Sequence, residues 1–494
     1  MVRHQVAKSL LWTALESGGL SSISLLTLIA FAWLLSPEQI GLATIALSVV
    51  QLLTVPVDVL FRDALVQRPC VEEAHFETAL TASLALGLAL VLLGWACSGV
   101  LARFVGVAEI APIFAVMNLS LIPAGLAAVI AARQRRNLDF RSLAVRSLVG
   151  RSAGAGIGVA VAVYGAGVWS LVAQQILMVT CAAMVLCMSA RRPRLRFSFR
   201  HFYDLIGFGL RSVTVVSADF ACQPIFTLLV GVCLGPVSAG YINIAFRVVD
   251  MVRGTFASGV VQLALPVFQQ YQESLDRLRR GYSEASSFTC LLSFPVFAGL
   301  AVCSSEVVEL VFGAKWIPSA PYVFLLSTLA LPYFARVYAM PIMAAVGKPQ
   351  AALPGLLAAL AVVIVGTMTV GRGSLAAAAG VWAARLIAST PIDALILRRV
   401  SGIGLRTQIY GGLCPLIASI IMFGAVQAEK LFVLPGLPIV VQLAAMVSVG
   451  AVVYGCVILM LDYRTVTRLA DFMLSAIGRR IGVSSRLNPP GVRL

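Results

Sequence analysis

Arginine, aspartate and asparagine recur at helical spacing inside one apolar stretch of this sequence. Arg247, Asp250 and Arg253 follow one another at intervals of three residues, and Asn243 comes four residues before Arg247. Positions three or four residues apart share one face of a helix, so we expect these four side chains on one side of a helix. A guanidinium group presents a planar fork of donors that matches phosphate oxygens. This face could therefore bind an anion.

Ionisable and amide side chains also interrupt other apolar stretches, and they fall into three expected roles. An anionic group such as phosphate is expected to be bound by Arg247, Arg253, Arg336, Arg385 and Arg62. Charge pairing or coupling to an ion is expected of Asp250, Asp219, Glu16 and Asp58. A polar path is expected to be lined by Asn243, Gln223 and Gln262. No catalytic residue is expected, and the scattered histidines have no metal-ligand spacing.

Each of these charges also has a structural interpretation. A charge at the centre of a bilayer costs at least about 2.5–3.5 kcal/mol on insertion scales, so it should face water or a partner. Arg247 and Asp250 could form an internal salt bridge, and Arg62 could extend to the inner membrane surface. Trp316 could anchor a membrane interface or stack on a sugar. The arginines outnumber what Asp250 alone can neutralise, which favours a cationic cavity.

The elements that position these residues must lie in a membrane. The chain has 494 residues, of which 60% are hydrophobic and 12% charged, and its mean hydropathy is +0.95. Soluble proteins carry about 45–50% apolar and about 25% charged residues, so this chain has too few polar side chains to cover several soluble domains. The composition excludes a soluble enzyme, a disulfide-linked secreted module and a disordered scaffold.

No cofactor and no nucleic acid is expected as a ligand. The ten cysteines include no Cys-x-x-Cys pair and fit as small apolar residues. No Gly-x-x-x-x-Gly-Lys loop for ATP occurs. The net charge is +16, but the basic residues gather in segments expected on one side of the membrane, so the positive-inside rule accounts for the excess.

Apolar stretches of about 20 residues, the length that crosses a bilayer core, recur along the whole chain. Glycine and proline divide them into about fourteen expected transmembrane helices. Their ranges are 10–35, 38–61, 78–102, 108–132, 144–164, 167–189, 205–233, 236–262, 284–304, 320–345, 349–371, 375–397, 408–427 and 434–461. The expected fold is an all-α polytopic membrane protein. Gly150, Gly154 and Gly158 predict a close helix-packing face on the fifth of these helices.

Arginine and lysine are concentrated in alternate connections between the expected helices. The intervening connections contain only Arg103, Lys315, Arg372 and Lys430. This asymmetry predicts a multi-pass protein with both termini in the cytoplasm.

The two halves of the chain resemble each other. The segment Leu35-Ser36-Pro37, followed by Gly41, is echoed by Leu234-Gly235-Pro236, followed by Gly240, and Gly167-Val168-Trp169 is echoed by Gly380-Val381-Trp382. The echoes predict two six-helix bundles related by an axis along the membrane normal, the architecture of a carrier with a central cavity. We expect an N-terminal lobe at 1–190, a basic cytoplasmic linker at 191–204, a C-terminal lobe at 205–400, two added helices at 401–462 and a basic cytoplasmic tail at 463–494.

Two segments carry a family resemblance. Residues 133–141 read Arg-Gln-Arg-Arg-Asn-Leu-Asp-Phe-Arg, and residues 165–175 read Gly-Ala-Gly-Val-Trp-Ser-Leu-Val-Ala-Gln-Gln. They resemble the Wzx-type flippases, the polysaccharide-transporter branch of the multidrug/oligosaccharidyl-lipid/polysaccharide (MOP) exporters. The segments 234–241 and 265–268 look like the middle section of that family, and the resemblance covers about residues 8–400.

The resemblance implies a two-lobed, MATE-like fold in the bacterial inner membrane. It implies a cargo of undecaprenyl-diphosphate-linked oligosaccharide, flipped to the periplasmic leaflet for exopolysaccharide, capsule or O-antigen assembly, with succinoglycan-type exopolysaccharide as one option. It also implies an H⁺ or Na⁺ gradient as the energy source. Membrane lipids, a polysaccharide polymerase and chain-length proteins are the further expected partners.

Two other classes of protein remain as alternatives. A small-molecule antiporter of the same superfamily takes largely cationic cargo, which an arginine-rich cavity disfavours. A membrane polysaccharide polymerase or ligase commonly acts through a large outward loop. The longest outward segment here is 304–319, with Glu306 and Glu309 as its acidic residues. We therefore expect a transporter and not an enzyme.

Overall fold

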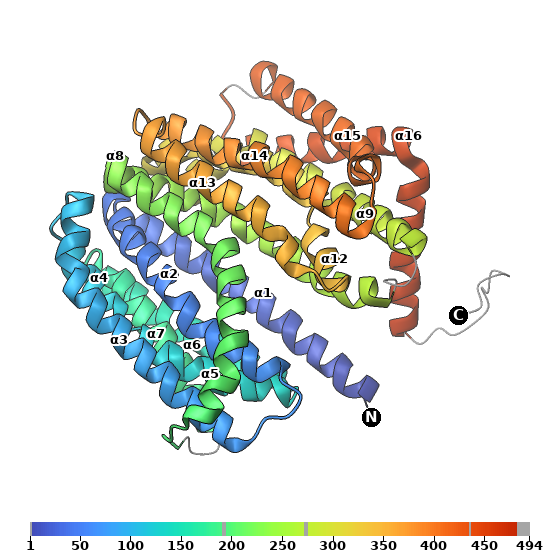
Figure 1. Ribbon diagram of the computed structural model, residues 1–494. Coiled ribbons are helices and arrows are strands. Elements are labelled where there is room, and N and C mark those ends of the chain that lie inside the picture. The colour runs from blue at the N-terminus through green and yellow to red at the C-terminus, as the bar shows by residue number, and fades with distance from the viewer. Residues whose placement is uncertain (1, 190–193, 271–274, 434–435, 482–494) are drawn as a thin grey trace.

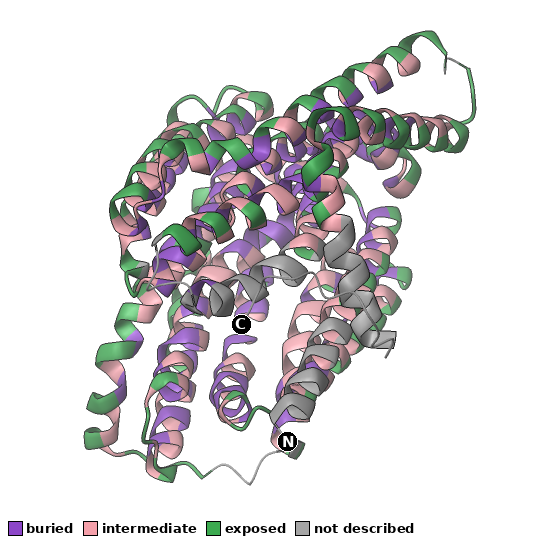
Figure 2. Cartoon of the chain, turned by 90° about the vertical axis from the view of Figure 1, so that its right-hand side faces the viewer, coloured by how far each residue is buried: buried purple, intermediate pink, exposed green. Residues whose placement is uncertain are grey.

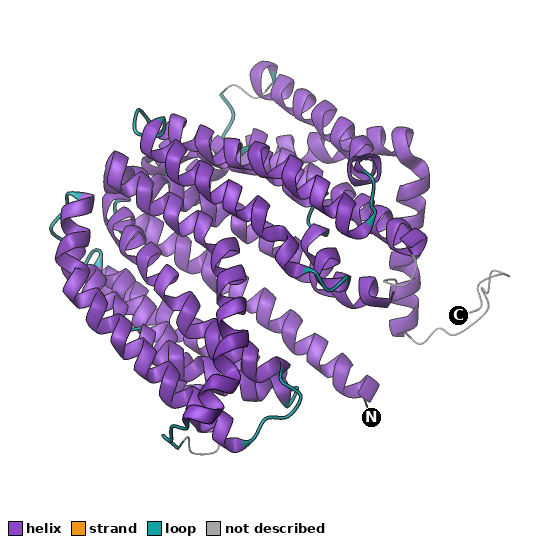
Figure 3. Cartoon of the chain, in the orientation of Figure 1, coloured by secondary structure: helices purple, strands orange, loops and turns teal. Residues whose placement is uncertain are grey.

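The computed structural model describes residues 2–189, 194–270, 275–433 and 436–481. Within these ranges the chain forms helices joined by turns and short irregular segments, and it contains no strand (Figure 3). Many large apolar side chains are exposed, among them Leu26, Met188 and Ile387. Exposed residues run along the outer helices of the molecule (Figure 2). Such exposure is expected where lipid replaces water. The expected all-α membrane fold is confirmed.

We call the helices before residue 190 the first lobe. They are α1 (Val2–Leu34), α2 (Pro37–Gln67), α3 (Glu73–Val105), α4 (Ile110–Asn118), α5 (Leu121–Arg136), α6 (Phe140–Val163) and α7 (Trp169–Ser189). The long helix α8 (Phe199–Gln270) follows. We call the next set the second lobe: α9 (Leu275–Val302), α10 (Ser304–Phe312), the 3-10 helix η1 (Ala314–Ser319), α11 (Ala320–Ala335), α12 (Ala339–Ala345), the 3-10 helix η2 (Pro349–Ala352), α13 (Leu353–Thr369) and α14 (Leu375–Ser401). The chain then adds α15 (Leu405–Phe432) and α16 (Ile439–Ile481).

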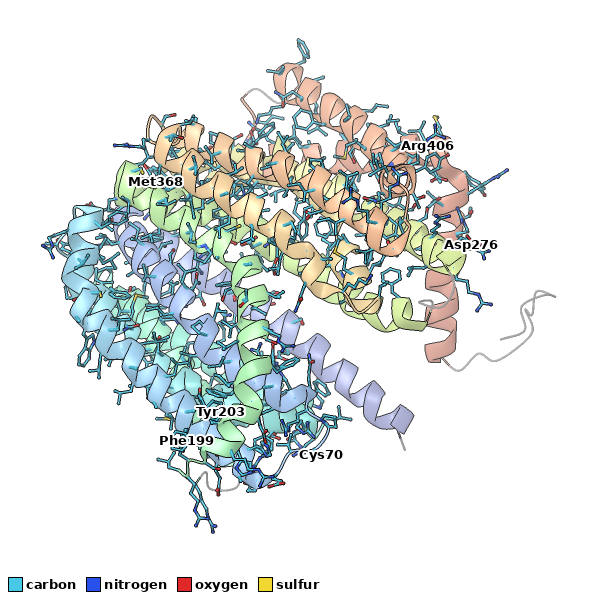
Figure 4. All side chains as sticks on the ribbon, in the orientation of Figure 1. Cys70, Phe199, Tyr203, Asp276, Met368 and Arg406 are labelled. Carbon is cyan, nitrogen blue, oxygen red and sulfur yellow. The ribbon has the colours of Figure 1, made fainter. Side chains whose placement is uncertain are left out.

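The two lobes meet at one end of the molecule and diverge toward the other (Figure 1). α1 is the helix of the first lobe that faces the second, α8 runs along the boundary between the lobes, and α2 packs along α8. The N-terminus lies at the diverging end, which we call the open end, and we call the opposite end the closed end. Tyr203 at the start of α8 lies at the open end beside the first lobe, Asp276 marks the open end of the second lobe, and Met368 lies at the closed end (Figure 4).

The repeated segments of the sequence meet each other at the closed end. Gly41 on α2 approaches the carbonyl oxygen of Pro236 on α8, and Gly240 on α8 approaches that of Pro37 on α2. A β-carbon would lie 1.8 Å from the Pro236 oxygen at Gly41 and 2.1 Å from the Pro37 oxygen at Gly240, so only glycine allows either contact. The contact is reciprocal, as a two-fold relation between the segments requires.

Local sequence determines how both helices turn at this end. Ser36 caps α2, because its hydroxyl accepts the Gln39 backbone N–H at 3.2 Å while the Gln39 side chain accepts the Ser36 N–H at 3.1 Å. Gly235 has φ 83° and ψ 171°, which interrupts α8 between two membrane-length segments. A positive φ is accessible to glycine at no steric cost.

A second set of contacts ties the end of α1 to the second lobe. Trp33 donates its indole N–H to the carbonyl of Val311 at 3.1 Å, and Trp316 donates to that of Ala32 at 2.9 Å. The Lys315 ammonium group donates to the carbonyls of Trp33 and Leu35, both at 2.9 Å. Trp316 is fully buried. The expectation that it anchors an interface or stacks on a sugar was therefore wrong.

The glycines of α6 form the predicted packing face. A β-carbon at Gly150 would lie 2.6 Å from the carbonyl oxygen of Met178 on α7, and one at Gly154 would lie 2.7 Å from that of Gln174. Gly158 packs equally closely on the Gln174 side chain. The prediction is confirmed, since the two helices approach at the distance that only small residues permit.

Twelve helical segments among the described residues are long and apolar enough to cross a membrane. One of these segments covers both parts of α8, which Gly235 divides into two membrane-length helices. α6 is not among the twelve, and it packs on α1 and α7. The arrangement is compatible with fourteen spans. Two expected helices are broken: 108–132 is divided into α4 and α5, and 320–345 into α11 and α12.

The helix ends at the expected linker (191–204) and at the expected tail (463–494) differ from the predicted positions. α7 ends at Ser189 and α8 begins at Phe199, six residues before the expected start at 205. α16 continues to Ile481 through a kink at Asp462, where φ is −146° and ψ is 58°. Much of the expected tail at 463–494 is therefore helical.

Candidate functional site

Arg247 is exposed within a buried stretch of α8. The other five residues from 244 to 249 are each at most 5% exposed. The Arg247 guanidinium donates from Nε to the Asn243 side-chain oxygen at 3.0 Å, as the shared helix face predicts. Within the described residues no carboxylate pairs with Arg247, so the considered salt bridge with Asp250 does not form. The guanidinium therefore keeps donors free for a ligand.

Asp250 is instead held by two other side chains. Its Oδ1 lies 2.8 Å from Nη2 of Arg253, and its Oδ2 accepts the Gln223 amide at 3.1 Å. The Arg253 guanidinium also lies 5.2 Å from the centroid of the Tyr333 ring on α11. Both side chains of the ion pair are about one-third exposed, at 37% for Arg253 and 33% for Asp250. Arg253 is thus neutralised but accessible.

Arg385 on α14 approaches the same region. Its guanidinium stacks on the Trp382 ring, 3.7 Å from the centroid, and its buried Nε has no hydrogen-bond partner. Its charge interacts with that of Arg253, and the charge of Arg253 interacts with that of Asp219. Asp219 is exposed on the first part of α8.

A further arginine reaches this region from the first lobe. Arg151 lies on α6, and its charge is close enough to repel that of Arg247 on α8. We define Arg151, Arg247, Arg253, Arg385, Asp219 and Asp250 as the interlobe site. Its four arginines face only two aspartates, so the site has an excess of positive charge. Like charges held together in a region of low dielectric are stabilised by an anion.

Arg151 was not among the expected site residues, although it lies within the expected helix 144–164, and the structure places it well inside α6. The helix begins at Phe140 because Asp139 caps it, accepting the Ser142 backbone N–H at 3.1 Å. This capping signal, an aspartate three residues before a serine, could have placed Arg151 about three turns into the helix. The run of arginines before it masked the signal.

A second cluster of charges lies in the first lobe and is balanced. Arg62 contacts the Asp58 carboxylate and donates from Nε to Asp63 at 3.0 Å. The charges of Arg135, Arg146 and Glu16 also interact within this group. Three arginines thus face three carboxylates. Arg62 is neutralised here, which leaves it little free charge for a diphosphate.

Arg336 is likewise paired. Its Nη2 lies 3.3 Å from Oδ2 of Asp393 on α14, and it stands at the break between α11 and α12 rather than midway along a helix. The Gln262 side chain lies outside the described residues. Of the five arginines proposed to bind diphosphate, Arg247 and Arg385 have no carboxylate partner among the described residues.

Two histidines that are distant in the sequence meet at the open end. The rings of His75 and His201 pack edge to face with centroids 4.5 Å apart, and Glu72 brings a carboxylate within 4.8 Å of both. His75 Nδ1 accepts the backbone N–H of Glu72 at 3.1 Å. The ring proton therefore resides on Nε2, which leaves no lone pair to bind a metal ion. This cluster caps α3 and fastens the start of α8 to it.

Comparisons with known proteins agree with this fold. A family model described as polysaccharide biosynthesis protein matches residues 30–321. The succinoglycan biosynthesis transport protein ExoT of Rhizobium meliloti is 26% identical over 472 residues, which cover 94% of this chain and 95% of that protein. The lipopolysaccharide biosynthesis protein WzxC of Escherichia coli is 22% identical over 337 residues, which cover 67% of this chain and 68% of that protein.

A solved structure shares the arrangement of helices. The lipid II flippase MurJ in an inward closed conformation superposes with a TM-score of 0.79 and 14% identity, covering 92% of this chain and 99% of that one. At this identity the likeness concerns the fold. The expected resemblance to Wzx-type proteins is confirmed by these relatives, and the fold agrees with it.

Proposed function

The chain belongs to the polysaccharide biosynthesis protein family, and from this we propose that it flips an undecaprenyl-diphosphate-linked oligosaccharide across the bacterial inner membrane. It is a membrane transporter of polysaccharide biosynthesis and not an enzyme. We propose that an H⁺ or Na⁺ gradient drives the transport of the lipid-linked cargo. We further propose that the cargo belongs to a pathway that makes exopolysaccharide, capsule or O-antigen. Succinoglycan-type exopolysaccharide is favoured because a succinoglycan transport protein is similar over nearly the whole chain.

The observation that carries the proposal is the unneutralised charge of the interlobe site. Arg247 on α8 is exposed without a carboxylate partner among the described residues, and the charge of Arg151 on α6 of the first lobe is close to it. Two guanidinium groups can each donate in parallel to phosphate oxygens, so the pair suits a diphosphate. A ligand held between the lobes can also pass from one side of the membrane to the other when the lobes rock.

The sidedness of the membrane follows from the basic residues. Arg133, Arg200, Arg280 and Arg398 lie in segments expected in the cytoplasm, and the open end carries the ends of the helices that bear them. We assign the open end and both termini to the cytoplasm and the closed end to the periplasm. The structure then corresponds to an inward-facing form that can admit cargo from the cytoplasmic leaflet.

The residues of the interlobe site have different proposed roles. Arg247 and Arg151 bind the diphosphate directly, and Arg385 adds positive charge behind them. Arg253 is shared between cargo and Asp250, so cargo binding and charge pairing compete there. Asn243 and Gln223 orient the arginine and the aspartate that they contact. Arg62 and Arg336 act less directly, because carboxylates hold both.

A MATE-like antiporter of small cations is the alternative, and the charge of the site disfavours it. A cationic drug would have to enter a site in which four arginines face two aspartates, at a cost in Coulomb energy. Ethidium accumulation by cells that express the protein measures this alternative directly. Active ethidium efflux that requires Asp219 and Asp250 would favour the antiporter.

The proposal is tested with purified full-length protein in vesicles of phosphatidylethanolamine and phosphatidylglycerol. The probe is a short-chain polyprenyl diphosphate with a fluorescent group that an external reductant bleaches. We expect Arg247→Ala and Arg151→Ala each to slow flipping by roughly tenfold or more, since a hydrogen bond to a charged group contributes about 1.5–3 kcal/mol. In cells, Arg247→Ala should abolish polymer export while membrane abundance stays near normal.

Arg372→Ala is the matched control, because Arg372 is an exposed arginine outside the interlobe site. It should flip the probe at the wild-type rate. Wild-type flipping by both Arg247→Ala and Arg151→Ala would exclude the diphosphate assignment.

A further inference from the structure

We propose that Asp393 on α14 is the residue that binds the coupling proton, and that Arg336 is its counter-ion in the inward-facing form. The inference rests on the proposed function, because it names the site through which a proton gradient drives the flippase. It assigns coupling to a residue behind the interlobe site rather than to the aspartates within it.

The contact between Asp393 and Arg336 can be broken by one proton. A single pair of atoms, Nη2 of Arg336 and Oδ2 of Asp393, approaches to 3.3 Å, so the pair is not bidentate. The side chains are 17% and 25% exposed, which leaves a route for a proton. An ion pair at membrane depth must offset a large desolvation penalty, and such pairs commonly mark proton pathways.

α13 leaves room for this carboxylate. Gly355 faces Asp393 so closely that a β-carbon there would lie 1.7 Å from Oδ1. Any other residue at 355 would displace the carboxylate from its place beside Arg336. The Asp393 carboxylate is thus packed directly against the backbone of α13 at Gly355. An ordinary apolar contact between two helices does not require a charged group and a glycine to face each other.

The helix that carries Arg336 is broken at this residue. Arg336 has φ −122° and ψ 8°, and α12 begins three residues later. Three hydroxyl groups of α9 contact the residues at the break: Ser286 donates to the Ala335 carbonyl at 3.3 Å, Tyr282 donates to it at 3.5 Å, and Thr289 bonds the Tyr338 hydroxyl at 2.7 Å. Broken helices lined by polar groups are where secondary transporters bind their coupling ions.

The break is also in contact with the helix that bears the interlobe site. Tyr333, one turn before Arg336 on α11, stacks with Arg253, and Tyr338, just after the break, packs edge to face on Phe268 of α8 with centroids 5.7 Å apart. A change at the break would therefore reach α8 on both sides.

Few other ionisable groups face Asp393 in the described part of the chain. α9 contributes Tyr282, whose hydroxyl lies in the field of Arg336, and the turn before α12 contributes Tyr338, whose hydroxyl is bonded to Thr289. α15 contributes the neutral Gln408 amide, which donates to the Ala394 carbonyl at 3.1 Å. Arg336 is thus the principal charge that Asp393 meets, and neutralising Asp393 leaves Arg336 without a partner.

The proton balance of the cycle is simple. In the outward-facing form a periplasmic proton adds to a carboxylate oxygen of Asp393, which becomes a neutral carboxylic acid while Arg336 keeps its charge. The released guanidinium allows the break to shift and the lobes to return inward. In the inward-facing form the proton leaves to the cytoplasm and the ion pair re-forms, the arrangement that the structure has. No other reactant is required.

The test compares two measurements on the same vesicles: exchange of the fluorescent polyprenyl diphosphate without a gradient, and its net accumulation under a pH difference in sodium-free buffer. We expect wild-type protein to show both. Asp393→Asn should keep exchange within about threefold of wild type and lose accumulation, and Asp393→Glu, which keeps a carboxyl group, should retain accumulation.

The matched control is Glu306→Gln. Glu306 pairs with Lys430 at 2.7 Å in the same half of the molecule, at the closed end, and should leave both measurements unchanged. Removing one partner of a buried pair can also unfold a protein. The double variant with Arg336→Gln and Asp393→Asn carries no orphaned charge and tests the same point if the single variant is not stable.

Accumulation at the wild-type level by Asp393→Asn, or by the double variant, would overturn the assignment, as would accumulation by the wild type that requires sodium instead of a pH difference. Absence of exchange in the wild-type protein would instead contradict the proposed function. The two failures are therefore distinct.

Discussion

Arg133 and Arg136 stand in one basic run, yet they stabilise different parts of the first lobe. Arg133 pairs with Glu73 at 2.5 Å and stacks on the Phe76 ring at the start of α3. Arg136 donates to the carbonyls at the end of α2 and just beyond it, those of Leu65, Val66, Arg68 and Pro69. A guanidinium group thus satisfies the carbonyls that a helix C-terminus leaves unpaired.

Arg136→Ala should therefore destabilise the protein. Several carbonyls would lose a charged donor, and a hydrogen bond to a charged group contributes about 1.5–3 kcal/mol. We expect a lower temperature of aggregation for the detergent-solubilised protein and a lower abundance in the membrane. Arg103→Ala, at an exposed site, serves as the comparison and should leave both unchanged. Equal stability of the two variants would show that water replaces Arg136 without loss.

The residue types of the site could be read from the sequence, but their pairing could not. The shared face of Asn243 and Arg247 follows from helical periodicity, and the hydrogen bond between them agrees with it. The preference of Asp250 for Arg253 over Arg247, and the approach of Arg151 from another lobe, depend on tertiary packing. Periodicity carries no information on which of two equidistant partners a carboxylate meets.

At the level of the helix, long apolar stretches predict well where the chain crosses the membrane. They predict poorly where a transmembrane helix is interrupted. Leu119 and Ser120 separate α4 from α5 at a point without glycine, where Pro123 in the first turn of α5 was the available signal and was not used to divide the stretch. α11 and α12 separate at Arg336, four residues after Pro332, where the proline was a usable but ambiguous signal. Such breaks cost backbone hydrogen bonds that only the tertiary structure can replace.

Larger residues should destabilise the protein when they are placed on the face of α6 that packs on α7. Larger residues on the opposite face of α6 should not. Gly154→Leu would place a β-carbon 2.7 Å from the Gln174 carbonyl oxygen, and overpacking of this kind typically costs about 1–3 kcal/mol. Gly156 lies two residues away on the same helix, and a β-carbon there meets nothing within 4 Å. We expect Gly154→Leu to lower thermal stability in detergent and Gly156→Leu to preserve it. Similar melting of the two variants would contradict the close contact.

For the whole molecule, segments that resemble each other in the sequence lie in direct contact in the structure. The echo of Pro37 and Gly41 in Pro236 and Gly240 was found from spacing alone, and these residues meet at the closed end. The divergence of the lobes at the other end had no such signal. It depends on which of several conformations the molecule adopts, and one sequence encodes all of them.

The closed end should open more readily when the hydrogen bonds between the end of α1 and the second lobe are removed. Lys315→Met removes the donors to the Trp33 and Leu35 carbonyls while keeping a long side chain. Leu35 is 2% exposed, so a cysteine placed there is protected while this end stays closed. We expect a membrane-impermeant maleimide to label Leu35→Cys several-fold faster when Lys315→Met is present. Labelling at the same rate in Lys315→Met and in Arg372→Met would show that Lys315 does not hold this end shut.

The mutual contact of Gly41 with Pro236 and of Gly240 with Pro37 has a consequence for how such a chain could arise. A half-length ancestor with one copy of this segment could have met a second copy of itself through the same self-complementary surface, as an isologous dimer does. Gene duplication and fusion would then have preserved a junction that already existed. After fusion, neither copy could accept a larger residue at its glycine, because the other copy fills the space beside it.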